Sequence, residues 1–137
     1  MDGDNMKNLE QRIDMAMQLH KKGFNCAQSV AMPFAEDFGL DPVLVARATE
    51  GFGAGMGGRE QACGALSGVI FLAGLKNSDG NLDAPASKQS TYKICDKLCK
   101  TFEQECGSAV CKDIKSINRR SCNECIKLGV CLADGLL

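Results

Sequence analysis

Helical periodicity most limits what this chain can fold into, because apolar residues recur every three or four positions in each patterned segment. No segment alternates between apolar and polar residues as a half-buried strand would. Helices are predicted over residues 6–21, 26–34, 42–46 and 61–75, with a short helical piece over 109–114. A long helix is opened by Pro85 or Ser87 and runs to about residue 106, and a last helix is capped by Ser121 or Asn123 and runs toward residue 136. A length of 137 residues suits one domain, so the pattern predicts a single compact all-α domain of five or six helices over residues 1–137.

Capping and breaking residues mark the ends of the first three helices. Gly23 ends the first helix, and Asn25 is a suitable N-cap for the second. Pro33 lies inside the second helix and should kink or shorten it. Asp41 followed by Pro42 begins the third.

A glycine-dense loop is expected over residues 51–58. Gly53, Gly55 and Gly58 match the pattern G-x-G-x-x-G, but the dinucleotide-binding fingerprint requires a preceding strand and a βαβ unit, and here a helix precedes the loop. The loop is instead expected to fold over a site built from cysteines, with main-chain N–H groups facing sulfur or a bound anion.

The composition excludes several classes of partner. Lys and Arg number 16 against 17 Asp and Glu, a formal net charge of -1, so no strong field draws the chain to nucleic acid or to an anionic membrane. Trp is absent and aromatic residues are few, which disfavours a base-stacking surface. The longest apolar stretch, 69–75, is too short to span a bilayer, and the acidic first five residues do not resemble a signal peptide. We therefore expect a cytoplasmic protein.

Nine cysteines are the unusual part of the composition, and an odd number cannot all pair within one chain. They are Cys26, Cys63, Cys95, Cys99, Cys106, Cys111, Cys122, Cys125 and Cys131. Because cytosolic thiols are kept reduced, a framework of structural disulfides is the weaker interpretation. Core packing, metal ligation and thiol redox chemistry remain, and they do not exclude one another.

Two cysteines are predicted to stand where a helix begins. Cys26 follows the capping Asn25, and Cys63 lies near the start of the helix over 61–75. The N–H groups and partial positive charge at a helix start stabilise a thiolate, which is the form that attacks disulfides and binds metals. Cys26 and Cys63 are therefore the predicted catalytic residues, with burial as small apolar side chains as the alternative.

Several blocks of the sequence resemble one known family. They are Asn25-Cys26-Ala27-Gln28-Ser29-Val30, Glu50-Gly51-Phe52-Gly53-Ala54-Gly55-Met56-Gly57, Cys63-Gly64-Ala65-Leu66-Ser67-Gly68, and a block with Phe102, Gly107, Ser108 and Cys111. Together they resemble the bacterial and archaeal "putative redox-active protein" family, named for its C…CGAxxG…C…C pattern, over nearly the whole chain. The resemblance implies a helical domain with four functional cysteines, proposed to be redox-active, without an established reaction. Carried over, the four are Cys26, Cys63, Cys111 and Cys125, with Cys122 and Cys131 as competitors for the last position.

Cys122 and Cys125 form a CxxC, a spacing suited both to metal chelation and to a dithiol couple. A thioredoxin-like site is excluded because no βαβ pattern surrounds it, and a structural zinc site would usually require a second CxxC or a His pair. The predicted metal-binding set is Cys26, Cys63, Cys111, Cys122 and Cys125. Cys131 points about half a turn away from Cys122 and is expected to lie outside the site.

Three further cysteines form a stripe on the long helix. Cys95, Cys99 and Cys106 share one face with Tyr92 and Phe102, and a core position is the favoured interpretation. Alternatively, Cys95 and Cys99, one turn apart, ligate a metal or form a reversible pair.

Gly64 and Gly68 lie on one helix face, where they would admit either a cofactor or a neighbouring helix close to the backbone. They are the predicted cofactor-binding residues, with helix packing as the alternative. His20 is the only histidine, and its place on the apolar face of the first helix favours a core role over a catalytic pair with Cys26.

The leading hypothesis is redox work by clustered cysteines, either as an electron-carrying iron–sulfur site or as a thiol/disulfide relay. A module that binds zinc or copper without redox turnover is the alternative, and a structural domain with buried cysteines is the third. Four cysteines can satisfy the ligand demand of a cluster, whereas a dithiol relay needs only two. We predict that Cys26, Cys63, Cys111 and at least one of Cys122 and Cys125 converge in space. The redox partner would be a protein or a small-molecule electron carrier, and no sequence feature decides whether the chain is an enzyme.

Overall fold

A computed structural model describes residues 7–137, and within that range it contains helices and no strand. The helices are α2 (Leu9–Lys22), α3 (Cys26–Ala31), α4 (Pro42–Thr49), α5 (Gly53–Met56), α6 (Gly64–Asn77), α7 (Lys88–Cys106), α8 (Cys111–Ser116) and α9 (Cys122–Asp134). Three short 3₁₀ turns are η1 (Met32–Phe34), η2 (Glu36–Phe38) and η3 (Glu50–Phe52). The predicted all-α class is confirmed.

The predicted number of five or six helices is too low for residues 7–137. Seven helices are present even when α5 is set aside, because the short piece around residue 111 is a helix in its own right. In α5, Ala54 and Gly55 have left-handed backbone angles, so this segment is a tight glycine-rich coil rather than a regular helix. The predicted loop over 51–58 therefore contains η3 and α5.

Local capping explains where most helices begin. Asn8 caps α2 through a reciprocal pair of hydrogen bonds with Gln11, so the helix begins at Leu9, and Met6 lies outside the described residues. The same arrangement of Asn25 and Gln28 caps α3. As expected, Pro33 shortens this second segment: α3 ends at Ala31 and Pro33 falls in η1.

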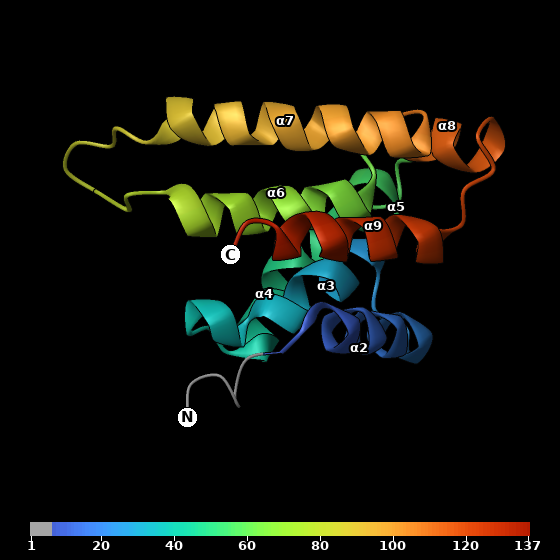
Figure 1. The fold of residues 1–137 in the computed structure, drawn as a ribbon, viewed down its shortest axis with the longest axis horizontal. Helices are drawn as coiled ribbons and strands as arrows, with labels where there is room; N and C mark the ends of the chain where they lie inside the picture. The colour runs from blue at the N-terminus through green and yellow to red at the C-terminus, as the bar shows by residue number, and fades with distance from the viewer. Residues whose placement is uncertain (1–6) are drawn as a thin grey trace.

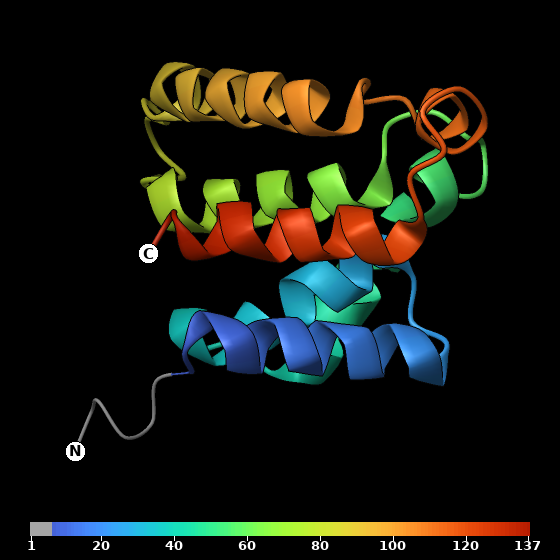
Figure 2. The same ribbon diagram turned by 45° about the vertical axis from the view of Figure 1, so that its right-hand side comes forward.

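The helices are stacked in layers, as Figures 1 and 2 show. α7 lies along one side, α6 and α9 form the middle, and α3, α4 and α2 complete the opposite side. α3 packs against α6, α9 and α2, so it is the centre of the fold. The N-termini of α6 and α9 and the whole of α8 lie at one end of the molecule, at the right in Figure 1.

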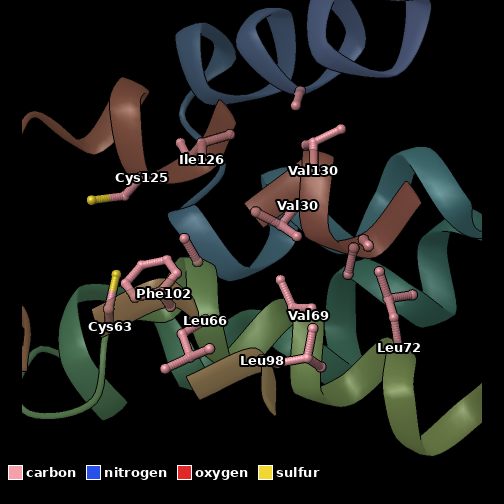
Figure 3. Packing of buried hydrophobic residues seen from close by; sticks show 14 of the residues in the cluster. Val30, Cys63, Leu66, Val69, Leu72, Leu98, Phe102, Cys125, Ile126 and Val130 are labelled. Carbon is pink, nitrogen blue, oxygen red and sulfur yellow. The ribbon is translucent and has the colours of Figure 1, made fainter. Parts of the chain in front are cut away.

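Buried apolar side chains from α3, α6, α7 and α9 form the core, part of which appears in Figure 3. The labelled members are Val30, Leu66, Val69, Leu72, Leu98, Phe102, Ile126 and Val130, with Cys63 and Cys125 at one edge. The core prediction for the α7 stripe is confirmed at Phe102 and Cys106, which are buried. It is wrong at Tyr92, which is 60% exposed because α7 has only α6 and the end of α9 on one side.

Glycines let α3 lie unusually close to its neighbours. A Cβ atom at Gly68 would lie 2.9 Å from the Ala27 carbonyl oxygen, and one at Gly129 would lie 2.8 Å from Val30. Gly68 thus admits a neighbouring helix, the packing role weighed for it from the sequence. None of the helices within residues 7–137 is both long and apolar enough to cross a bilayer.

Candidate functional site

Four helices begin at a cysteine around one cavity. Cys26, Cys111 and Cys122 are the first residues of α3, α8 and α9, and Cys63 is the N-cap residue of α6. All four line the cavity together with Cys125, so the predicted convergence of these cysteines is confirmed. The cavity has about 310 Å³ of space between atoms, part of it open to solvent. We call it the cysteine cavity.

The start of α3 is fixed by a network around Asn25. The Asn25 side chain accepts a hydrogen bond from the Gln28 amide and donates one of 2.8 Å to the Glu50 carbonyl. Gly53 lies directly against that side chain, where a Cβ atom would collide with it. The glycine-rich coil therefore holds the N-cap of α3 in place. Its Ala54 lines the cavity, so the coil folds over the cysteine site as expected, while the role expected for its N–H groups stays a prediction.

Cys63 and Cys111 are brought together by a pairing of two extended segments. Ala62 and Val110 form an isolated antiparallel bridge, and the Cys63 amide donates a 2.8 Å hydrogen bond to the Ala109 carbonyl. The Cys111 amide donates in return to the Gln61 carbonyl. Because residues 61–63 are extended in this pairing, α6 begins at Gly64 rather than at the predicted residue 61.

Cys63 and Cys125 form the inner pair of the cavity. Both are buried, with exposed fractions of 5% and 3%, and Figure 3 shows their sulfur atoms at the same edge of the core. The Cys125 thiol donates toward the Cys63 sulfur, which lowers the pKa of Cys63 to about 7 against the opposing effect of burial. The amides of Ala65 and Leu66 in the first turn of α6 lower it further.

The pKa of Cys125 shifts in the opposite direction from that of Cys63. Its proton is shared with the Cys63 sulfur and its surroundings are buried, and both effects raise the pKa of Cys125. A third sulfur adjoins it, since Cys106 Sγ lies 4.0 Å from Cys125 Sγ. The inner pair thus combines a thiolate at neutral pH with a thiol, and Cys106 is within reach of the thiol.

The expectation that a helix start lowers the pKa of Cys26 is wrong. Burial is the largest effect and raises the pKa of Cys26 to about 12, and the neighbouring Cys122 and Cys63 add to the rise. α3 has only six residues, so its partial charge is too small to offset the loss of water. Of the two predicted nucleophiles, only Cys63 is favoured as a thiolate.

His20, Cys26 and Cys122 form the outer group. Their potential ligand atoms all lie within 4.8 Å of one another, and all three side chains are half-buried. His20 comes from the last turn of α2 and its Nδ1 lies 3.0 Å from Asn123 Oδ1 on α9. The outer group therefore joins three helices, α2, α3 and α9.

Two cationic residues also line the cavity. The pKa of Lys115 is raised, because the sulfurs of Cys122 and Cys111 lie close to its ammonium group. Arg120 also lines the cavity and pairs with Glu124 at 3.4 Å. Their charges, together with four helix starts, favour anionic species in the cavity.

Of the other residues that the sequence analysis selected or weighed, some line the cysteine cavity and others lie elsewhere in the fold. Gly64 lines the cavity, whereas Gly68 faces α3, and no bound group tests the cofactor role of either. Cys95, Cys99 and Cys131 do not line it.

Sequence reasoning weighed His20 as a partner of Cys26 but favoured a core role, whereas the structure leaves His20 half-buried with a ring nitrogen within 4.8 Å of the Cys26 and Cys122 sulfurs. It did not select Lys115, Arg120 or Cys106 for the site. The positions of these three depend on how α7, α8 and α9 meet, which no local pattern shows.

Of the comparisons with known proteins, one finds a match, to a family of sequences. Neither a curated protein nor a solved structure matches the chain. A family model matches residues 24–134, a range that contains all nine cysteines. The family's pattern is written with GCAxxG rather than the expected CGAxxG, and this chain reads Cys63-Gly64-Ala65-Leu66-Ser67-Gly68, with the Cys before the Gly. The resemblance noted from the sequence is thereby confirmed, and the chain belongs to the family described as "Putative redox-active protein (C_GCAxxG_C_C)".

Proposed function

We propose that this protein is a thiol-based redox carrier in which Cys63 and Cys125 alternate between a dithiol and a disulfide. The observation that supports this most is the inner pair itself: two adjacent buried sulfurs, one favoured as a thiolate and one as a thiol, where four helices begin at cysteines. A dithiol couple requires such an asymmetry, because only the thiolate attacks.

The exchange begins at Cys63. Its thiolate attacks one sulfur of an incoming disulfide, forms a mixed disulfide and releases the first thiolate product. Cys125 then attacks the Cys63 sulfur, its proton passes to the second leaving thiolate, and the Cys63–Cys125 disulfide forms. Two electrons have moved from the protein to the substrate disulfide, and the reverse sequence would oxidise an incoming dithiol.

The surroundings favour a small substrate. Cys63 and Cys125 are almost fully buried, so the sulfur of a folded partner protein would reach them only after local opening. A low-molecular-weight disulfide would need less opening than a folded protein, and Lys115 and Arg120, which line the cavity, favour an anionic one.

A metal centre held by the same cysteines is the second candidate, because the donor set fits one. Thiolates are the usual ligands of iron–sulfur clusters, and Cys26, Cys63, Cys111, Cys122 and Cys125 all line one cavity. When bound, a cluster would supply one-electron transfer. The protein's own part would be to hold the thiolates at helix starts and to place Lys115 beside them.

Anaerobic purification followed by mild oxidation with glutathione disulfide separates the two candidates. We expect less than stoichiometric iron and acid-labile sulfide, and a mapped disulfide that joins the peptides of Cys63 and Cys125. Cys125→Ser should abolish that disulfide, and Cys131→Ser, outside the cavity, should leave it. Stoichiometric iron and sulfide would replace the proposal with a cluster, and stoichiometric zinc or copper without a disulfide would replace it with a non-redox metal module.

A further inference from the structure

We infer that the outer group, His20, Cys26 and Cys122, is a binding site for a single borderline or soft divalent ion such as Zn²⁺. This inference does not rest on the inner pair, which uses other sulfurs. It concerns a residue, His20, that neither the cysteine pattern nor the CxxC includes.

The distances suit one ion. The three ligand atoms lie within 4.8 Å of one another. With Zn–S of about 2.3 Å and Zn–N of about 2.0–2.1 Å, tetrahedral ligands lie roughly 3.5–3.8 Å apart. The group therefore has to contract by only about 1 Å, which side-chain rotation can supply because all three residues are half-buried rather than fixed in the core.

Asn123 prepares the histidine for ligation. Its Oδ1 lies 3.0 Å from His20 Nδ1, and a carbonyl oxygen can only accept, so Nδ1 carries the proton and donates it. The lone pair is then on Nε2, the nitrogen free to bind an ion. Histidine ligands in metal sites are commonly held in this way by a second hydrogen bond.

The donor chemistry points to the same class of ion. One imidazole and two thiolates are ligands of Zn²⁺ and its close analogues, and the two thiolates balance a divalent charge. Three protein ligands leave one position for water or for an exchangeable ligand. The ion would also link α2 and α3 to α9, beside the cysteine cavity that Cys26 and Cys122 line.

Co²⁺ is the probe for this site, because its thiolate complexes absorb in the near ultraviolet and its tetrahedral complexes absorb in the visible. Reduced, anaerobic full-length protein is titrated with Co²⁺ and the bands are then displaced by Zn²⁺. We expect one Co²⁺ per chain with both kinds of band. His20→Ala and Cys122→Ser should each weaken Co²⁺ binding at least tenfold, with His20→Gln as a second variant if the helical circular dichroism of the first is reduced.

Substitutions at Asn123 test the role of His20 in metal binding more specifically, because they leave all three proposed ligands in place. Asn123→Ala should weaken Co²⁺ binding about 10- to 100-fold, as loss of a ligand-orienting hydrogen bond does elsewhere, and Asn123→Asp should restore it because a carboxylate accepts the same hydrogen bond. Lys21→Ala, next to His20, and Cys131→Ser should bind Co²⁺ as the unchanged protein does.

Two results would overturn the inference. One is Co²⁺ binding that His20→Ala and His20→Gln leave unchanged. The other is binding that Cys63→Ser or Cys125→Ser removes as completely as Cys122→Ser does, since the ion would then belong to the whole cysteine cavity. Disulfide mapping of His20→Ala keeps the two proposals apart, because the Cys63–Cys125 disulfide should still form in that variant.

Discussion

Cys26 and Cys63 stand at equivalent places in the sequence pattern, each at a helix start, yet their pKa values move in opposite directions. The Cys63 sulfur accepts a hydrogen bond from the Cys125 thiol and faces two backbone amides. Cys26 is flanked by other sulfurs that oppose a second negative charge, and burial raises its pKa further. The neighbours, rather than the helix start alone, decide which cysteine is a nucleophile.

The first prediction is the pH dependence of alkylation at Cys63. Its pKa is lowered from 9.0 to about 7, and only the thiolate reacts, so the rate should rise with pH and reach half its maximum near pH 7. Short iodoacetamide pulses read by mass spectrometry give the rate at each pH. Cys95 is the internal control, since burial raises its pKa and its labelling should increase only at more alkaline pH. A midpoint for Cys63 near that of Cys95 would contradict the assignment.

The second prediction concerns the third sulfur, at Cys106. In the absence of Cys63, Cys125 still has the sulfur of Cys106 at 4.0 Å. Oxidised Cys63→Ser should therefore form a Cys106–Cys125 disulfide, because closing to a bond of about 2.05 Å requires little movement of the two side chains. Peptide mapping identifies the pair, and the double variant Cys63→Ser/Cys106→Ser should lose it. A Cys122–Cys125 disulfide in that variant would contradict this prediction and show that the two cysteines of the CxxC form the redox-active pair.

At the scale of elements, the contact between α6 and α3 positions the two helix starts that carry Cys63 and Cys26. Gly64 lies at this contact, where a Cβ atom would come 3.2 Å from the Cβ of Cys26. Gly68 continues the same face one turn later against the Ala27 carbonyl. The close approach of the two helices thus aligns Cys63 with Cys26 across the cavity.

The third prediction uses two glycines of the same helix. Gly68→Ala places a methyl group 2.9 Å from a backbone oxygen, so it should destabilise the protein by about 1–2 kcal/mol after the gain in helix propensity. Gly74→Ala has nothing within 4 Å and should stabilise it by up to about 1 kcal/mol. Urea unfolding of both variants measures the difference. Equal free energies of unfolding would show that α3 and α6 do not pack this closely.

Local sequence signals predict most helix boundaries. Boundaries that depend on contacts with residues far away in the sequence cannot be predicted in this way. Asn25 with Gln28 marks the start of α3, and Gly107 marks the end of α7, because each acts on its own helix. The start of α6 was placed three residues too early, since residues 61–63 are held extended by a segment more than forty residues away. Likewise, the family pattern predicted which cysteines meet, but only the packing of α2 on α9 shows that His20 joins them.

At the scale of the whole molecule, a buried arginine joins the N-terminal helices to the last one. The Arg12 guanidinium is 1% exposed and makes two hydrogen bonds to Asp37, at 2.9 and 2.6 Å. It also lies 3.6 Å from Asp134 at the end of α9 and 4.4 Å from the ring centre of Phe34. This cluster fixes α2 against α9, and α2 carries His20 to the Cys26 and Cys122 side chains.

The fourth prediction follows from that burial. Arg12→Ala should destabilise the protein by about 3–5 kcal/mol, because it leaves a largely buried Asp37 without its partner. Lys7→Ala, which breaks the exposed pair with Glu36, should cost about 0–1 kcal/mol. Thermal unfolding followed by circular dichroism compares them. Similar losses in the two variants would mean that the Arg12 cluster does not hold the helices together.

A redox titration in glutathione buffers tests the central claim most directly. Anaerobic protein is equilibrated over a range of glutathione to glutathione disulfide ratios, quenched with acid and alkylated, and each cysteine is scored by mass spectrometry. The account predicts one two-electron transition, a tenfold change in the ratio of disulfide to dithiol for about every 30 mV, in which Cys63 and Cys125 become protected together while Cys95, Cys99 and Cys131 stay free. Free Cys63 and Cys125 at every potential, or protection of either one without the other, would contradict it.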